Sequence, residues 1–465
     1  MENILHDFNN KIISLSENYL KNLIFEKGIS GFTDDLIKEF AEFGSNLTQY
    51  LIEYVEETIF VLEGRKEKFN ILEKDSRDIV SIFGEISFKR RYYKDKNTNT
   101  KVYLLDKLIG LEPKQRLLTN VRERLIKEAI ESSYEKAGEC AAYGVKISRQ
   151  EVKNEIESLD LDKEFYEKAS VKKKAKRLYI IADEDHVHLQ KGGIEEPRMI
   201  VVYENVVSKG KRIELKNKRH FGGTYKNKID ELWEKVSLYI EENYDEKVLE
   251  EVFILGDGAN WIKTGKSWIY KSKYVLDEFH LSKAITGIVG RYNPEEKEYK
   301  RKIYKSLRDS DYNYFKEICY EIISEEMNLR IRERKEKLMK YVISNAEGIN
   351  HLYKNKEKLH GCSAEGHISH IFSDRMSSRP MGWKEENINN MSKLRLLKED
   401  KITVKEILRK QKTVIDINEY KEIKEQTNEK IRKRINFKPV SLPIITFGSH
   451  EEREYFRKIL DNEAV

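Results

Sequence analysis

Two short apolar runs in the middle of the chain each end at an aspartate. The run 252–255 stops just before Gly256 and Asp257, and the run 274–276 stops at Asp277, with His280 three residues later. Apolar runs of this length with polar or glycine boundaries predict buried strands. Carboxylates at strand ends of an α/β sheet lie in the crevice where ligands bind. Aspartates in these positions also cap helices, so the pattern leaves both roles open.

A third apolar run predicts where a partner carboxylate would lie. The run 178–182 ends directly at Asp183. The predicted strands are 178–182, 198–207, 212–215, 252–255 and 274–276, with an amphipathic helix at about 227–244. Three successive strands followed by alternating helices and strands are the order of a ribonuclease-H-like sheet. In that sheet the first and fourth strands are neighbours, so we expect Asp183 and Asp257 to come together.

The segment before this sheet carries polar side chains suited to nucleic-acid contacts. Ser148 and Glu151 form an S-x-x-E capping box, which predicts a helix that begins at Ser148. A helix from about Ser133 to Gly144 would precede it, and the pair has the layout of a helix-turn-helix. The residues expected to contact DNA are Ser148, Arg149, Gln150, Lys153 and Asn154. An ordinary helical hairpin with a solvated face is the alternative.

A basic, aromatic stretch at 79–105 alternates as strands do, with a turn at 95–99, and predicts a β-hairpin. Lys89, Arg90 and Arg91 stand beside two tyrosines, which suits contact with a nucleic-acid backbone. An edge strand protected by charged side chains has the same pattern, and the sequence does not separate the two.

The bulk numbers exclude some classes of protein. A length of 465 residues predicts about three domains, and 39% hydrophobic residues suffice for real cores. The net charge of +6 is too mild to indicate a polyanionic partner by itself. No apolar run approaches the ~18 residues of a membrane span, and the three cysteines imply no disulfide framework. We therefore expect a cytoplasmic protein without a membrane segment.

Four motifs in order make the chain similar to one family. They are ADEDHVHLQ at 182–190, GDGANWI at 256–262, LDEFHLSK at 276–283 and GCSAEGHISHIFSDRMSSRPMGW at 361–383. Together they resemble the Lre-type bacterial insertion-sequence transposases, which are related to Mutator-like DDE transposases and were formerly described as an uncharacterised protein family. The resemblance covers residues from about 76 to 400. It also likens Asp277 and His280 to the Cys/Asp-x-x-His motif of the Mutator-like enzymes, which places His280 at the catalytic site.

The resemblance implies that Asp183, Asp257 and Glu365 form a DDE triad that holds two Mg²⁺ ions, for which Mn²⁺ could substitute. Strand cleavage and strand transfer are in-line displacements at phosphorus, in which two divalent ions stabilise the attacking and leaving oxygens. Carboxylate oxygens are hard ligands of the kind that Mg²⁺ prefers. The implied partners are the terminal inverted repeats of the element and target DNA, with a homodimer or larger assembly that acts on the nucleoid.

Some assignments stay open at this point. Asp185 is an alternative to Asp183 as the first ligand. Glu347 is an alternative to Glu365, because residues 346–348 repeat the Ala-Glu-Gly of residues 364–366. A zinc site is a minor alternative for the late motif, although its ligand spacing is not that of a standard finger. Its four possible ligands are His360, Cys362, His367 and His370.

The expected fold class is α/β. A ribonuclease-H-like core with a mixed sheet is interrupted by an all-helical insertion and preceded by a helical, helix-turn-helix DNA-binding region. The predicted domains are a helical region at 1–75, a β-hairpin at 76–112, a helix-turn-helix at 113–170, the core at 171–283 and 361–400, the insertion at 284–360 and a basic helical region at 401–465. Two competing hypotheses are a regulatory DNA-binding relative without transposition and a ribonuclease-H-like nuclease.

Overall fold

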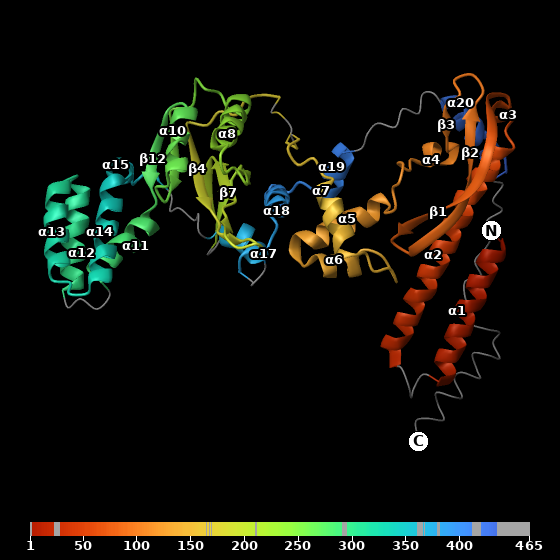
Figure 1. Ribbon diagram of the computed structural model, residues 1–465, viewed down its shortest axis with the longest axis horizontal. Coiled ribbons are helices and arrows are strands. Elements are labelled where there is room, and N and C mark those ends of the chain that lie inside the picture. The colour runs from red at the N-terminus through yellow and green to blue at the C-terminus, as the bar shows by residue number, and fades with distance from the viewer. Residues whose placement is uncertain are drawn as a thin grey trace. The chain divides into compact units, whose positions relative to one another are not determined.

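The protein folds as two compact units. One comprises residues 1–118 and 413–465, and the other comprises residues 119–412. The computed structural model, drawn in Figure 1, describes residues 2–22, 28–163, 165–166, 168, 170–209, 212–290, 295–359, 366, 368–378, 382–411 and 420–434. Among these residues no helix is both long and apolar enough to cross a membrane.

The first unit packs helices against a three-stranded antiparallel sheet. Its helices are α1 Glu2–Asn22, α2 Gly28–Phe60, α3 Glu63–Lys68, α4 Leu104–Ile109 and α20 Lys421–Arg434. Helix α2 contributes Ile59 to the core near its C-terminal end. Farther towards the N-terminus, Phe43 of α2 stacks on Phe8 of α1, with ring centroids 4.1 Å apart.

The sheet of this unit corrects the sequence prediction. Its strands, in sheet order, are β1 Phe69–Ser81, β2 Gly84–Asp95 and β3 Lys101–Val102. The predicted turn at 95–99 is present, but it joins β2 only to the short β3. The main hairpin pairs β1 with β2 around residues 82–83, so residues 69–75 are strand and not helix. The mostly polar and exposed side chains of residues 70–76 hid β1, because its buried apolar residues lie only at its two ends, at Phe69 and at 79–80.

The second unit begins with three short helices, α5 Thr119–Glu131, α6 Tyr134–Cys140 and α7 Arg149–Glu157. The predicted start at Ser148 is confirmed, because its hydroxyl accepts a hydrogen bond from the Glu151 amide at 3.1 Å. The preceding helix ends at Cys140, earlier than expected. Gly138 lies directly against the main-chain oxygen of Ile147, where a larger residue would clash.

A five-stranded mixed sheet forms the centre of the second unit. Its strands are β4 Arg177–Glu184, β7 Arg198–Tyr203, β10 Arg219–Gly223, β11 Glu251–Gly256 and β12 Ser272–Leu276. The sheet order is β10-β7-β4-β11-β12. The first three strands in the chain pair antiparallel, whereas β4, β11 and β12 are parallel neighbours. The predicted adjacency of the first and fourth strands is therefore confirmed.

The third strand of this sheet was predicted in the wrong place. Residues 212–216 form β9, which pairs with β8 Asn205–Lys209 in a separate two-stranded ribbon. The third strand is β10, whose two glycines gave it no strand signal. Gly222 is required there because it lies directly against the main-chain oxygen of Arg198 on β7. A second short ribbon is made by β5 Val187–His188 and β6 Ile194–Glu195.

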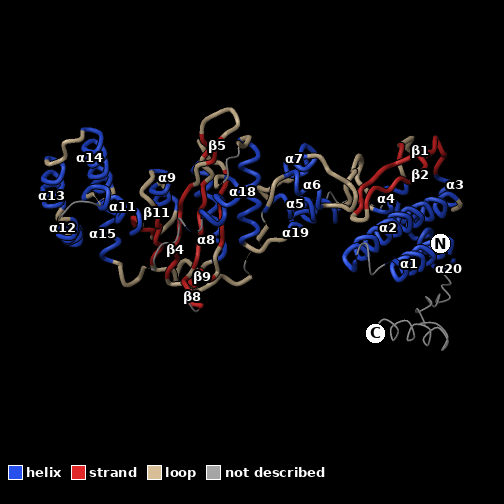
Figure 2. The backbone as a smooth tube through the Cα atoms, turned by 90° about the horizontal axis from the view of Figure 1, so that it is seen from below, coloured by secondary structure: helices blue, strands red, loops and turns tan. Residues whose placement is uncertain are grey.

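Helices flank the sheet, as the tube in Figure 2 shows. They are α8 Ile229–Asn243, α9 Asn260–Lys263, α10 Gly265–Trp268, α11 Glu278–Val289 and α18 Glu385–Glu399. Trp233 of α8 is fully buried, and its indole N–H donates to the main-chain oxygen of Trp261 at 2.8 Å. This contact fixes the α9 segment, which follows the Asp257 turn, against the core.

Residues 295–359 form four helices, and no strand occurs among them. They are α12 Glu296–Arg308, α13 Tyr312–Ser324, α14 Leu329–Ser344 and α15 Ala346–Lys354. Figure 1 shows them bundled to one side of the sheet, with α15 next to β12.

The last part of the second unit is helical. A π-helical segment at Ser369–Ser373 and α17 Asp374–Met376 precede α18. The predicted C-terminal region at 401–465 divides, because α19 Val404–Gln411 lies in the second unit and α20 in the first. Residues 442–447, whose sequence also has a β-like pattern, lie outside the described residues.

Candidate active site

The parallel pairing of β4 and β11 brings two carboxylates together at the carboxyl-terminal ends of these strands. Ile181 pairs with Leu255, and each of these residues is followed two positions later by an aspartate. Asp183 and Asp257 therefore stand at neighbouring carboxyl ends of parallel strands, where ligands bind in open α/β sheets. The sequence predicted this pair from strand order alone.

The pair carries negative charge that the protein does not fully balance. Burial is the main cause that raises the pKa of Asp183 to about 7. The negative charges of Asp257 and Glu184 contribute to this rise, and the hydrogen bond from the Glu184 amide and the charge of His280 oppose it. A half-buried carboxylate beside a second carboxylate favours any arrangement that brings in positive charge. The donor set consists of hard oxygens, so it fits a divalent cation such as Mg²⁺.

Asp277 caps a helix, which is one of the two roles that its position suggested, and it also contacts His280. It is the N-cap of α11 and accepts from the Phe279 amide at 3.3 Å. Its second oxygen lies 3.1 Å from Nδ1 of His280. This hydrogen bond raises the pKa of His280, and the charges of Asp257 and Asp183 act in the same direction. Asp277 therefore orients a histidine that is favoured in its cationic form beside the two carboxylates.

The helical insertion builds one wall of the Asp257 turn. The hydroxyl of Tyr341 on α14 donates to the main-chain oxygen of Asp257. Gly258, at φ 99°, lies against the side chain of Asn345, so a larger residue would be both strained and blocked. The buried Asn345 also accepts from the Tyr274 hydroxyl at 3.2 Å. Nothing in the sequence pattern connects these residues to Asp257, because the contacts are long-range.

A third acidic side chain, Glu184, supports the end of β4. Its carboxylate accepts from the indole N–H of Trp261, and the Arg198 guanidinium lies 5.4 Å from the Trp261 ring. Burial raises the pKa of Glu184, and the nearby charge of Asp257 adds to that effect. Sequence reasoning passed over Glu184, because it lies between two aspartates that look more like ligands.

The two rival residues each have a side-chain partner. Asp185 is buried, and its two oxygens accept from the Ser377 hydroxyl at 3.1 and 2.9 Å. Both oxygens of Glu347 accept from the Lys266 ammonium at 2.8 Å. The charge of Asp183, in contrast, raises the pKa of His280.

The late motif is described only in part. Glu365, the predicted third ligand, lies outside the described residues, as do His360, Cys362 and His367. His370 is described; it is mostly exposed and lies 3.5 Å from Asp374. Within the described ranges, no group of three or more His, Cys, Asp or Glu is placed to hold a metal ion.

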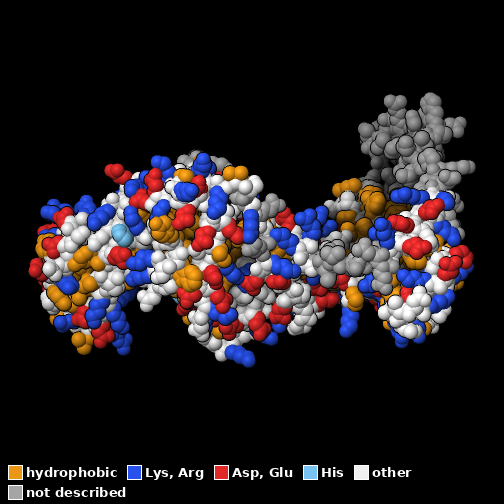
Figure 3. All heavy atoms as spheres, turned by 90° about the horizontal axis from the view of Figure 1, so that it is seen from above, with side chains coloured by type: hydrophobic (Ala, Val, Ile, Leu, Met, Phe, Trp, Pro, Cys, Tyr) orange, Lys and Arg blue, Asp and Glu red, His pale blue; other side chains and the backbone are white. Residues whose placement is uncertain are grey.

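The predicted DNA-contacting residues of α7 form a polar face with internal pairs. Arg149, which is 71% exposed, pairs with Glu135 of α6. The Gln150 amide donates to Asn154 at 2.7 Å, and Lys153 pairs with Glu157 at 3.0 Å. Ser148 is used as the helix cap. Basic and acidic side chains are interspersed over the face drawn in Figure 3, so net charge alone does not single out a nucleic-acid surface there.

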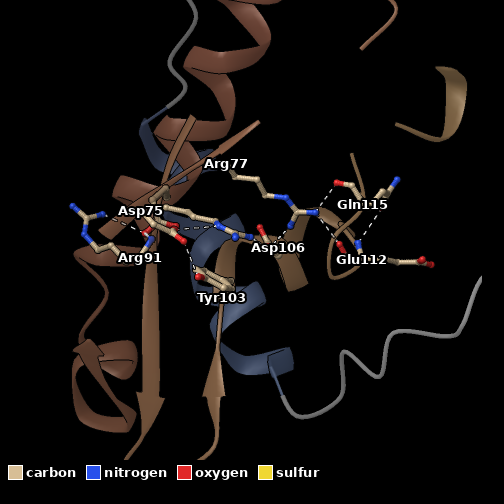
Figure 4. A network of polar contacts seen from close by, with 9 residues as sticks. Asp75, Arg77, Arg91, Tyr103, Asp106, Glu112 and Gln115 are labelled. Atoms are coloured by element: carbon tan, nitrogen blue, oxygen red, sulfur yellow. Dashed lines mark hydrogen bonds and ion pairs between the residues drawn. The ribbon is translucent and has the colours of Figure 1, made fainter. Parts of the chain in front are cut away.

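The hairpin arginines, which the sequence offered as DNA contacts, form ion pairs within the first unit. Figure 4 shows the polar network around Asp106. The Arg77 guanidinium lies 2.5 Å from the Asp106 carboxylate, and Arg90 pairs with the same carboxylate. Arg91 pairs with Glu56 at 3.3 Å and with Glu57 at 2.8 Å. Both arginines are thereby largely buried. Lys89 alone of the predicted trio is exposed.

Comparison with known proteins identifies the family of the chain. Residues 27–413 match the model of an uncharacterised protein family, UPF0236. A UPF0236 protein of Caldanaerobacter subterraneus subsp. tengcongensis, whose name joins eleven designations, is 35% identical over 440 residues, which are 93% of this chain and 90% of the relative.

Two further relatives bear the same family name. One from the same organism, whose name joins four designations, is 35% identical over 401 residues, or 85% of this chain and 84% of the relative. One from Streptococcus gallolyticus, named for the vanSb 3' region, is 26% identical over 339 residues, or 68% of this chain and 71% of the relative. The chain therefore belongs to the uncharacterised protein family UPF0236.

Proposed function

We propose that this protein is the DDE transposase of a bacterial insertion sequence. The observation that carries the proposal is the pair Asp183 and Asp257, held at adjacent ends of the parallel strands β4 and β11. In this role the protein binds the ends of its element and catalyses metal-dependent cleavage and transfer of DNA strands.

The sheet supports a ribonuclease-H-like core. Three antiparallel strands come first in the chain, and two parallel strands then add beside the first of them, giving the order β10-β7-β4-β11-β12. The first and fourth strands, β4 and β11, are neighbours, as a ribonuclease-H-like order predicts. The insertion between β12 and the late motif, and a capped helix α7 behind a short turn, agree with the rest of the expected layout.

The site residues fit the two divalent cations that this chemistry uses. Asp183 and Asp257 would hold them, with Glu365 as the third ligand contributed by the late motif. Bound cations would stabilise the charge on the attacking and leaving oxygens of the phosphoryl transfer. Asp277 keeps His280 oriented beside the carboxylates, and Tyr341 with Asn345 keeps the Asp257 turn in place.

The names of the relatives support a mobile gene. One protein that carries eleven designations in a single organism is the pattern expected when a gene is repeated in a genome. Insertion sequences multiply in this way, whereas a housekeeping nuclease or a single regulator does not need to. Terminal inverted repeats and a short target duplication beside the gene for this chain are therefore expected from its flanking DNA.

The direct test is a nicking reaction. A labelled DNA fragment taken from the flank of the gene is expected to be nicked at a fixed position only when protein and Mg²⁺ are both present. Binding without nicking at any Mg²⁺ or Mn²⁺ concentration would support the competing regulator. Nicking at arbitrary positions in unrelated DNA would support a ribonuclease-H-like nuclease.

Replacing Arg149 or Gln150 by Ala is expected to weaken binding to the end fragment while the protein stays folded. Each good contact from such a side chain to a base edge is worth ~1–3 kcal/mol, so a roughly tenfold loss is expected. Gel-shift titration at one fixed salt concentration measures it. Lys247→Ala is the control. It removes an exposed charge just before β11, at the end of that strand opposite Asp257, and this variant should bind the end fragment normally. Tight binding by both α7 variants would remove the recognition role.

Tyr341→Phe is expected to slow nicking about fivefold without changing end binding. The substitution removes only the hydroxyl that donates to the Asp257 carbonyl, and one such hydrogen bond contributes ~1 kcal/mol. The rate should recover partly at higher Mg²⁺, because the displaced carboxylate binds the cation less tightly. Tyr320→Phe, on the exposed side of α13, is the matched control. A parental rate at every Mg²⁺ concentration would show that Tyr341 does not position Asp257.

A further inference from the structure

A cavity of about 540 Å³ lies within the second unit, between α6 and α7 on one side and the start of α18 on the other. Its lining includes Tyr134, Arg149, Lys153, Arg375, Trp383 and Asn387. Its size falls within the ~300–1,000 Å³ range of small-ligand sites. The polar face of α7 therefore lines an open cavity of the size of a small-ligand site.

Two polar atoms on the lining residues have no hydrogen-bond partner within the described ranges. They are the hydroxyl oxygen of Tyr134 and the side-chain oxygen of Asn387. Asn387 is only 8% exposed. Buried polar groups are almost always hydrogen-bonded, so two unpaired groups on the residues of one lining favour a partner at this place.

The charge of the lining favours an anionic ligand. Four cationic side chains, Arg149, Lys153, Arg375 and Lys384, face one acidic side chain, Glu135. The aromatic rings of Tyr134 and Trp383 meet edge to face at 6.3 Å. A basic lining with aromatic faces is the combination that binds single-stranded nucleic acid.

The aromatic wall is held rigidly. The Trp383 amide donates to the His188 oxygen at 3.0 Å, and its indole N–H donates to the Met376 oxygen at 3.1 Å. The Arg375 guanidinium carbon lies 4.9 Å from the Trp383 ring. A preformed wall of this kind lowers the ordering cost of binding.

We propose that this cavity receives a single nucleotide of DNA that is turned out of the duplex. Arg149 and Lys153 contact its phosphate, the rings of Tyr134 and Trp383 border its base, and Asn387 with the Tyr134 hydroxyl bonds to the base edge. Unstacking a base costs a few kcal/mol, which such contacts offset. The inference rests on the proposed function, because it requires that the protein binds DNA.

Tyr134→Phe tests the site without endangering the fold. Removing a buried hydroxyl that has no protein partner should leave the melting temperature unchanged or slightly higher. It should weaken binding of a fluorescent twelve-residue oligothymidylate about fivefold to tenfold, because one hydrogen bond is lost. Tyr143→Phe, at an exposed position after α6, should bind normally. Equal affinity of the parent and Tyr134→Phe would overturn the site.

A duplex end fragment that carries 2-aminopurine reports the extrusion itself. Its fluorescence should rise when the parent protein binds, and Asn387→Leu should reduce that rise at saturating protein. Normal gel-shift binding without any rise defeats this inference but leaves the proposed function standing, whereas absence of all DNA binding defeats the proposed function. Competition by thymidine monophosphate or inorganic phosphate at the concentration of the oligonucleotide would identify a free-nucleotide or phosphate site instead. A cavity that holds only solvent would show none of these effects.

Discussion

Asp257→Asn is expected to abolish Mg²⁺-dependent nicking while binding of the end fragment stays nearly normal, and Asp183→Asn and Glu365→Gln should do the same. Each change keeps the size of the side chain but removes the charge that would hold a divalent cation. Loss of a cation removes several kcal/mol of transition-state stabilisation, and each 1.36 kcal/mol is tenfold, so a loss of about a thousandfold or more is expected. DNA binding rests instead on Lys and Arg contacts to phosphates.

The matched control for this prediction is Asp185→Asn. Its side chain is occupied by Ser377, and an asparagine oxygen can still accept from that hydroxyl, so the variant should nick DNA. Nicking should be followed over time with a labelled end fragment, alongside gel-shift titration. Near-normal nicking by Asp257→Asn would refute the triad. An inactive Asp185→Asn together with an active Asp183→Asn would show that the first ligand is Asp185 and not Asp183, and would leave the rest of the triad unchanged.

Asp106→Ala is expected to destabilise the first unit by ~3–5 kcal/mol. Its carboxylate pairs with both Arg77 and Arg90 in a site that is largely removed from water (Figure 4). Removing one partner of a buried ion pair leaves an uncompensated charge, which is the costly change. Hydrogen exchange of the amides in β1 and β2, measured in the full chain, reports the stability of this unit separately.

Lys89→Ala is the comparison for that experiment. Lys89 is adjacent to Arg90 on β2 but exposed, so its loss should change the free energy of unfolding by less than ~0.5 kcal/mol. Equal protection of β1 and β2 in Asp106→Ala and Lys89→Ala would show that the buried network does not stabilise the hairpin.

What the sequence predicted well was local. The strands that end at Asp183, Asp257 and Asp277 are bounded by abrupt changes from apolar to polar or glycine residues, and strand order alone placed the first two aspartates together. The start of α7 followed from the capping residue Ser148, which needs only its own helix.

What the sequence missed depends on partners that are distant in the chain. The polar strand β1 looked helical, because the apolar residues that cover it come from other elements. The glycine-rich β10 is a strand because Gly222 fits against Arg198 on β7. The strand propensities of its residues do not predict this contact. The ion pairs of Arg90 and Arg91 with Asp106, Glu56 and Glu57 could not be foreseen, because these partners are distant in the chain. The hydrogen bond from Tyr341 to the main-chain oxygen of Asp257 also joins residues that are far apart in the sequence.

The central claim is tested most directly by a strand-joining reaction. The protein is incubated with Mg²⁺, a labelled DNA fragment from the flank of its gene and a supercoiled plasmid. If it is a DDE transposase, the label becomes covalently joined to the plasmid through a newly exposed 3′-hydroxyl, and Asp257→Asn gives no joined product. If the protein binds the fragment but neither nicks nor joins it with Mg²⁺ or Mn²⁺, the proposed function is wrong.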